Sequence, residues 1–542
     1  MKKAFLLFLF FSFQHICIAQ SWQDTVLLIV RAMADFKPEK PGAQLAISRN
    51  GQLIFSQAWG MADLEHNVAL TTESIIEAGS VSKQFTAAAI LLLEQQGKLS
   101  IDDDVRKYIP ELPDYGATIT LRHLMHHTSG IKDWGAIAAI GGWPRTTKTY
   151  SNHDALLIMC RQKTLNNLPG DEFIYSNSGY NLFAIIVERV SGESLAEFTR
   201  KNIFLPAGMK HTEWRNNFKK IVHNRAIAYS RAGNTYFMDM PNEYVYGNGG
   251  LLTTAEDLLL WNNYYMAGKF GNSSLLPMQL STTALNSGKH NNYAAGLIVD
   301  SVRGWKSISH TGATAGYRSM LQHFPDLGLT IAWLLNSSDI DNGPNVAVTV
   351  RNLLVKDMSV VFKKAEPVFY NIPVEKLKNY TGWYRDKKTA AANKLVLRND
   401  TLRTLAGNAL FPIAENIFVQ GQARMEVTSG IPATFLLING ADSVLYVAAD
   451  SAQTDEKHLQ EYAGDYLSDE ADAKLTIKVK DGKLMAQQEA PVTEMLLVPT
   501  YKDGFRMYGF NVYFERNKKN KITSLHVFSG RARNVVFVKQ TK

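Results

Sequence analysis

The sequence predicts an α/β domain with an antiparallel sheet and a helical subdomain, followed by two small antiparallel β units. Strand-like runs lie near both ends of residues 20–365, and helical segments lie between them. Beyond about residue 365, long helical periods give way to short alternating strands, and a sequence motif repeats within this part. We therefore expect one domain over 20–365 and barrel-like β units over 366–455 and 456–542.

The order of the elements supports this division. Residues 43–60 predict a hairpin, because two strand-like runs flank the turn signal Arg49-Asn-Gly51. A long apolar helix precedes Gly97. The remaining expected elements are helices near 154–161, 182–190, 195–202, 257–265 and 346–362, and strands near 294–300, 305–310, 317–324 and 329–336. Since strands stand at both ends, we expect sequence-distant strands to meet in one sheet.

The repeat marks the start of each β unit. Leu377–Tyr384 (LKNYTGWY) matches Leu459–Tyr466 (LQEYAGDY), and each copy precedes a strand-rich stretch. Two separate meanders or barrels of roughly 80 residues explain this best, and a single barrel built from both copies is the alternative.

The composition is that of an ordinary globular protein. The chain has 542 residues, 46% of them hydrophobic and 20% charged, with a formal net charge of +8. The basic residues are spread out, apart from a cluster at 516–521 that we interpret as a solvated turn. We find no nucleic-acid-binding motif and expect no such partner. The sequence leaves the oligomeric state open.

Residues 1–19 have the pattern of a secretory signal peptide. Lys2 and Lys3 precede an apolar run over 4–13 and small residues before a cleavage point after Ala19. The run is too short to span a bilayer, so we expect a periplasmic or secreted bacterial protein without a stable membrane span. The mature chain keeps only Cys160, which excludes an intramolecular disulfide.

The stretch around Ser80 and Lys83 carries the first chemical motif. Residues i and i+3 share one helix face, so the hydroxyl and the amine are neighbours. Phe85–Leu93 is apolar nearly all round, which indicates a buried helix. Burial disfavours the charged lysine, and a lysine of this kind acts as a base. A serine needs such a partner before it attacks a carbonyl.

A second motif is Tyr175-Ser-Asn177. A tyrosine beside the lysine relays a proton, and an asparagine fixes the substrate carbonyl and the lysine. The triplets at 150–152 and 246–248 have the same form. We interpret those two as hydrogen-bonded loops and select Tyr175, because a buried helix follows it.

The third motif is His310-Thr311-Gly312, at the end of a strand-like run. A small residue and a glycine on an edge strand allow a substrate backbone to lie close. The amide of Ala313 would then pair with that of Ser80 to hold an oxyanion.

A metal site at His123 and His127 is the alternative use of the histidines, because these residues stand at i, i+4. No third ligand is evident, so we expect packing behind the site, and neither a metal nor another cofactor.

The three motifs follow one another as S-x-x-K, Y-x-N and [KH]-[TS]-G over about residues 30–360. In this order they resemble the class C β-lactamase and penicillin-binding-protein family of serine hydrolases. The two appended β units are similar in architecture to bacterial D-aminopeptidases. The resemblance implies a two-step acyl transfer: Ser80 attacks, Lys83 and Tyr175 handle its proton, and water releases the acyl group. Which of the two is the base stays open.

The expected function is that of an exported serine hydrolase acting on small peptides, amides or esters, with D-amino-acid peptides as one class. The alternatives are a β-lactamase or DD-carboxypeptidase, and a catalytically silent recognition protein. His310 stands where lysine is common in these enzymes, and histidine is mostly neutral above a pKa of about 6.5. We therefore predict weak recognition of C-terminal carboxylates.

The β units have two possible roles. They are either a structural appendage that buries one face of the first domain, or they extend a loop to the cleft and restrict substrate size. In the second case, deleting residues 459–542 broadens specificity without abolishing acylation.

Overall fold

The computed structural model describes residues 22–34, 36–145, 147–338, 343–358, 368–428, 433–440, 442–489 and 491–541. The expected signal peptide lies outside these residues, as does the last part of the expected helix 346–362.

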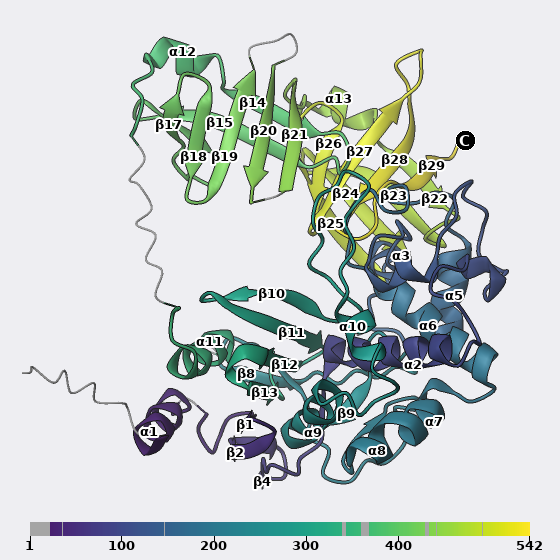
Figure 1. The fold of residues 1–542 in the computed structure, drawn as a ribbon. Helices are drawn as coiled ribbons and strands as arrows, with labels where there is room; N and C mark the ends of the chain where they lie inside the picture. The colour runs from purple at the N-terminus through teal and green to yellow at the C-terminus, as the bar shows by residue number, and fades with distance from the viewer. Residues whose placement is uncertain are drawn as a thin grey trace, which may run out of the picture.

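A six-stranded antiparallel sheet forms the base of the first domain (Figure 1). Its strand order is β10-β11-β12-β13-β1-β2. β1 pairs with β13 from Ala43↔Leu335 to Arg49↔Leu329, so strands from the two ends of the domain do meet in one sheet. The bounds are β1 Ala43–Arg49, β2 Gln52–Trp59, β10 Ile298–Val302, β11 Trp305–Thr314, β12 Tyr317–Phe324 and β13 Leu329–Leu335.

Helices cover both faces of this sheet. α1 (Trp22–Ala32) and α11 (Gly343–Leu354) pack together on one side, and α9 (Ala255–Met266) packs on β1 and β13. The helical subdomain is centred on the pair α2 (Lys83–Gln95) and α6 (Asn177–Ser191). The other helices are α3 Leu121–Met125, α4 Trp134–Ile140, α5 Asn152–Cys160, α7 Leu195–Thr199, α8 Leu205–Ala207 and α10 Leu275–Leu280.

The first domain also contains three small sheets. The one nearest the site has the order β5-β9-β6 and lies directly before the helix that carries Ser80. The strands are β3 Met61–Asp63, β4 Val68–Ala69, β5 Ile76–Glu77, β6 Glu213–Trp214, β7 Tyr229–Ala232, β8 Thr235–Met238 and β9 Leu251–Thr253.

The two β units are separate bodies, so one shared barrel is excluded. The first is an eight-stranded sheet in the order β16-β15-β14-β21-β20-β19-β18-β17, and the second, β22 to β29, is a closed barrel. Each unit opens with a short helix, α12 (Val374–Lys378) or α13 (Glu456–Gln460). In both, the second tyrosine of the repeat donates to the carbonyl of the first, Tyr384 to Tyr380 at 2.9 Å and Tyr466 to Tyr462 at 2.7 Å.

The strands of the β units have the following bounds. In the first unit they are β14 Gly382–Asp386, β15 Ala392–Arg398, β16 Thr401–Thr404, β17 Phe411–Ala414, β18 Ile417–Gln420, β19 Ala423–Thr428, β20 Thr434–Asn439 and β21 Asp442–Ala449. In the barrel they are β22 Gly464–Ser468, β23 Ala473–Lys480, β24 Lys483–Glu489, β25 Val492–Pro499, β26 Gly504–Met507, β27 Phe510–Arg516, β28 Ile522–Phe528 and β29 Val535–Lys539.

The closed barrel packs on the helical subdomain (Figure 1). Its apolar core continues into Ile137 and Ile140 of α4. Beside this contact, Lys132 and Glu470 form an ion pair at 3.0 Å, with side chains only 0% and 5% exposed. The barrel therefore buries one face of the first domain. In the described part of the chain, no helix combines the length and the apolar character that crossing a membrane requires.

Candidate active site

Ser80 and Lys83 lie where a short 3-10 helix, Gly79–Ser82, runs into α2. The Lys83 amine lies 3.1 Å from the Ser80 Oγ, 2.9 Å from the Asn177 Oδ1 and 2.5 Å from the carbonyl oxygen of Asn248. The lysine side chain is fully buried, because α2 is apolar on nearly every side. The structure thus brings the first two motifs together.

The surroundings of Lys83 favour its neutral form. Burial lowers the pKa of Lys83 well below 10.5, and the nearby Arg145 and Arg531 lower it further. Two of its three partners are carbonyl oxygens, which only accept hydrogen bonds. A neutral amine satisfies both with its two N–H groups, and its lone pair then faces the Ser80 hydroxyl. This arrangement suits a lysine base beside a serine nucleophile.

Tyr175 lies next to this pair. The Lys83 Nζ is 4.9 Å from the centroid of its ring. Burial raises the pKa of Tyr175 to about 12, and the nearby Ser80 opposes this shift. The buried Tyr175 hydroxyl has no hydrogen-bond partner among the described residues. A protonated phenol beside Ser80 is available to give a proton rather than to take one.

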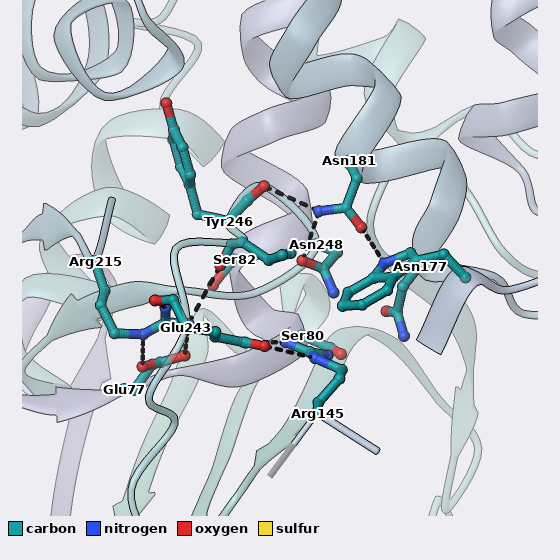
Figure 2. A network of polar contacts seen from close by, with 12 residues as sticks. Glu77, Ser80, Ser82, Arg145, Asn177, Asn181, Arg215, Glu243, Tyr246 and Asn248 are labelled. Atoms are coloured by element: carbon teal, nitrogen blue, oxygen red, sulfur yellow. Dashed lines mark hydrogen bonds and ion pairs between the residues drawn. The ribbon is translucent and has the colours of Figure 1, made fainter. Parts of the chain in front are cut away.

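Amide side chains from both of the other triplets support the site, and Figure 2 shows the contact of Asn248 with Asn181. The Asn181 Nδ2 donates to the Oδ1 of Asn248 at 3.0 Å and to the Oδ1 of Asn152 at 3.2 Å. The triplet at 246–248 is a hydrogen-bonded loop, as we interpreted it, and the carbonyl of its Asn248 also contacts Lys83. The glycine-rich bend at 246–250 is the sequence feature that indicates such a close backbone approach.

The third motif lies within β11 rather than at its end. β10 pairs with β11 only as far as Ser309, so none of the described strands pairs with residues 310–314 on that side. They therefore form the local edge that a substrate backbone needs. A Cβ on Gly312 would lie 2.1 Å from the carbonyl oxygen of Ala78, and one on Gly79 would lie 2.7 Å from the Ala313 nitrogen. This close packing places the Ala313 amide beside the turn that carries Ser80.

His310 is buried and neutral. Burial lowers its pKa to about 3. Its Nδ1 lies 2.6 Å from the carbonyl oxygen of Thr311, so Nδ1 carries the proton. Its Nε2, 2.9 Å from the Tyr293 hydroxyl, then accepts from that tyrosine. His310 thus offers the cleft neither a positive charge nor a free donor.

His123 and His127, the two histidines considered for a metal site, have different roles. His123 accepts from the Thr120 amide at 3.2 Å and caps α3. His127 packs within the aromatic layer under the site, with its ring centroid 4.3 Å from that of Tyr175 and 4.4 Å from that of Tyr293. Burial lowers the pKa of His127 well below 6.5. His123 thus caps a helix, and His127 packs against the aromatic rings under the site.

A cavity of about 860 Å³ opens above Ser80. Among the side chains we predicted for the site, those that line it are Ser80, Tyr175, Asn177, His310, Thr311, Gly312 and Ala313, and Lys83 lies beneath them. Sequence reasoning missed Arg145 and Arg531, which also line it. Arg531 comes from the closed barrel, so a loop of the second β unit does reach the cleft.

A chain of ion pairs leads to Arg145, which lines the cavity (Figure 2). Arg215 bridges Glu77 at 2.8 Å and Glu243 at 3.2 Å, and Glu243 also pairs with Arg145. Glu77 ends β5, three residues before Ser80, so these ion pairs fix both the strand that leads to Ser80 and one arginine of the cavity wall. Buried charges of this kind need their partners, because an unpaired one is costly.

Fold and site together define a serine hydrolase. The chain belongs to the β-lactamase family, whose model matches residues 28–354.

Two relatives illustrate the range of this family. The chain is 30% identical over 316 residues to "Penicillin-binding protein 4*" of Bacillus subtilis, covering 54% of this chain and 67% of that protein. It is 23% identical over 516 residues to "D-aminopeptidase" of Brucella anthropi, covering 92% of this chain and 95% of that protein. The second match includes the β units.

Two solved structures share the fold. An octameric penicillin-binding protein homologue from Pyrococcus abyssi aligns with a TM-score of 0.54 at 21% identity, covering 95% of this chain and 99% of that one. A D-amino acid amidase from Ochrobactrum anthropi aligns with a TM-score of 0.53 at 21% identity, covering 61% and 99%.

Proposed function

We propose that this protein is an exported hydrolase that forms an acyl-enzyme on Ser80 and cleaves amide or ester bonds, with D-amino-acid amides and peptides as substrates. The observation that carries the proposal is the Lys83 amine, buried and placed 3.1 Å from the Ser80 Oγ. The named D-aminopeptidase that matches nearly the whole chain supports the substrate class.

The residues have the following roles in this proposal. The Ser80 hydroxyl gives its proton to Lys83 as its Oγ forms a bond to the substrate carbonyl carbon. The amides of Ser80 and Ala313 stabilise the negative carbonyl oxygen. Asn177 holds Lys83 and contacts the substrate amide, while Thr311 and Gly312 face the substrate backbone.

Breakdown of the intermediate returns the proton. The departing nitrogen or oxygen receives it from Lys83 through the Tyr175 hydroxyl as the bond to the carbonyl carbon breaks. In the second step, water gives a proton to Lys83 as its oxygen forms a bond to the acyl carbon. The bond between that carbon and the Ser80 Oγ then breaks, and Lys83 returns the proton to Ser80. Lys83 is thus the base in our proposal, and Tyr175 the donor.

Export rests on the signal-peptide pattern of residues 1–19. N-terminal sequencing of the protein secreted by a bacterial host should begin near Gln20. An intact N-terminus on protein retained in the cytoplasm would contradict export without touching the catalytic proposal.

A substrate panel tests the activity. It contains D- and L-amino-acid amides, short esters, nitrocefin and a cell-wall pentapeptide. We expect turnover of D-amino-acid amides or esters above that of nitrocefin, and none by the Ser80→Ala variant. Equal turnover by Ser80→Ala would contradict the nucleophile, and the absence of both turnover and covalent labelling would favour the silent recognition protein.

A further inference from the structure

The loop between β28 and β29, residues 529–534, extends from the closed barrel to the cavity above Ser80. Arg531 of this loop lines the cavity, with its guanidinium carbon 4.8 Å from the centroid of the Tyr175 ring. The Lys83 amine lies 4.9 Å from the same centroid. The guanidinium is therefore next to the side chains that we place at the reaction centre.

The backbone of this loop is fixed to the first domain. The carbonyl of Arg531 accepts from the Asp133 amide and from the Asn166 Nδ2, both at 3.0 Å. The Arg533 amide donates to the Asn166 Oδ1 at 2.7 Å. Asp133 in turn accepts from the Asn177 amide at 2.6 Å, so the loop and the site share one set of hydrogen bonds. A side chain carried on this backbone has a defined position.

The two arginines of the loop differ in their partners. Arg533 pairs with Glu172 at 3.0 Å and holds the loop in place. The Arg531 side chain is exposed and forms no ion pair with any residue that the structure describes. Its contact with Tyr175 orients the guanidinium but leaves its five N–H donors available.

The cavity wall is basic. Within the described parts of the chain, its lining contains no aspartate or glutamate, but it contains the four arginines Arg145, Arg318, Arg351 and Arg531. Arg145 is already paired with Glu243, and His310 adds no charge. A substrate group that lies against Tyr175 and this wall meets an uncompensated guanidinium.

We propose that the preferred substrates carry a carboxylate close to the scissile bond and that Arg531 binds it. This inference rests on the proposed function and narrows its substrate class. An arginine fork matches a carboxylate with two parallel hydrogen bonds, which a lysine cannot do. His310 carries no positive charge, but Arg531 of the closed barrel supplies one. The neutral His310 alone therefore does not imply weak recognition of carboxylates.

Matched ester pairs test the proposal and locate the carboxylate. 3-Carboxyphenyl phenylacetate against phenyl phenylacetate places it on the leaving group, and monophenyl glutarate against phenyl butyrate places it on the acyl group. We expect the acidic member of at least one pair to have the higher kcat/KM, by about 10- to 100-fold, as for a hydrogen bond to a charged group. This preference should shrink as salt is raised.

Variants of Arg531 give the decisive comparison. Arg531→Gln should remove the preference, Arg531→Lys should restore part of it, and Arg531→Glu should reverse it. Lys519→Gln, which removes a barrel charge away from the cavity, should keep both kcat/KM values. An unchanged acidic-to-neutral ratio in Arg531→Gln, or no preference in the wild type, overturns the inference.

A binding measurement separates this inference from the proposed function. Phenylboronic acid and 3-carboxyphenylboronic acid bind reversibly to a serine nucleophile, and calorimetry measures both without turnover. If both boronic acids bind weakly, and Ser80→Ala binds them as the wild type does, the proposed function is wrong. If both boronic acids bind with equal affinity and the binding depends on Ser80, only the role of Arg531 is wrong. If 3-carboxyphenylboronic acid binds more tightly and Arg531→Gln loses this difference, the role of Arg531 is supported.

Discussion

In our proposal, the chemistry at Ser80 depends on the lone pair of the Lys83 amine. Protonation of Lys83 would replace the lone pair that faces the Ser80 Oγ with a third N–H, and Ser80 would lose its base. Burial opposes this protonation, because it disfavours the ammonium ion and lowers the pKa of Lys83. Sequence reasoning could predict this pair, since both residues lie on one turn of an apolar helix. It could not predict which backbone carbonyl would orient the amine.

The first prediction concerns the protonation of Lys83. Because only the neutral amine is a base, kcat/KM should rise with pH and reach its plateau below pH 10.5, the ordinary lysine pKa. Lys83→Arg keeps a permanent charge and should lower the acylation rate by about 10²- to 10⁴-fold. Single-turnover acylation across a pH series measures both effects. An acylation rate in Lys83→Arg equal to the wild-type rate would exclude Lys83 as the base.

The second prediction concerns the buried neutral histidine. The pKa of His310 is lowered to about 3, whereas an unfolded histidine titrates near 6.5. The unfolded chain then binds the extra proton, so stability is complete above pH 6.5 and falls as pH drops toward 3. Below pH 6.5 the slope from this residue should approach about 1.4 kcal/mol per pH unit. Chemical unfolding at pH 7 and pH 5 measures it, and His310→Gln should flatten the dependence. A slope that the variant leaves unchanged would argue for a charged His310.

Among the elements, local patterns predicted the hairpin at 43–60, the buried helix after Ser80 and the repeat of helix and strand in the β units. Each depends on periodicity or turn residues within a short stretch. The triplets at 150–152, 175–177 and 246–248 show where this reasoning fails. Their residue types are alike, and only the packing of the 246–250 bend against α2 makes Asn248 a partner of Lys83.

The third prediction concerns the contact of β11 with the Ser80 turn. In Gly312→Ala the new Cβ would meet the Ala78 carbonyl at 2.1 Å and the Ser319 Oγ at 2.2 Å. We expect a loss of about 1–3 kcal/mol in unfolding free energy and slower acylation, because β11 must move away from Ser80. Gly530→Ala is the control, since no atom lies within 4 Å of its added Cβ. Equal stability of the two variants would show that the contact is loose.

On the scale of the whole molecule, the closed barrel is both a structural partner and a part of the cavity wall. It covers Ile137 and Ile140 of α4 and contributes Arg531. No sequence motif marks Arg531, because its function depends on the docking of two domains whose residues are far apart in the chain. Deleting residues 459–542 would also remove the partner of the buried Lys132, so point variants test the loop more sharply than the deletion does.

The fourth prediction concerns the docking of the barrel. Glu470→Ala leaves Lys132 buried without its partner and removes acceptors for the amides of Lys163 and Val536. We expect a loss of about 3–5 kcal/mol in unfolding free energy, together with weaker discrimination between the acidic and neutral esters. Asp472→Asn, which breaks the exposed pair with Arg161, should cost about 1 kcal/mol or less. A Glu470→Ala protein as stable as Asp472→Asn would show that the ion pair does not hold the domains together.

Covalent labelling at Ser80 tests the central claim most directly. The purified protein is treated with a fluorophosphonate probe, and intact-mass and peptide mass spectrometry locate the adduct. We predict one adduct, on the peptide that contains Ser80, formed by the wild type, formed slowly by Lys83→Arg and absent from Ser80→Ala. A wild-type protein that stays unlabelled, or a Ser80→Ala variant labelled to the same extent, would contradict the assignment of Ser80 as the nucleophile.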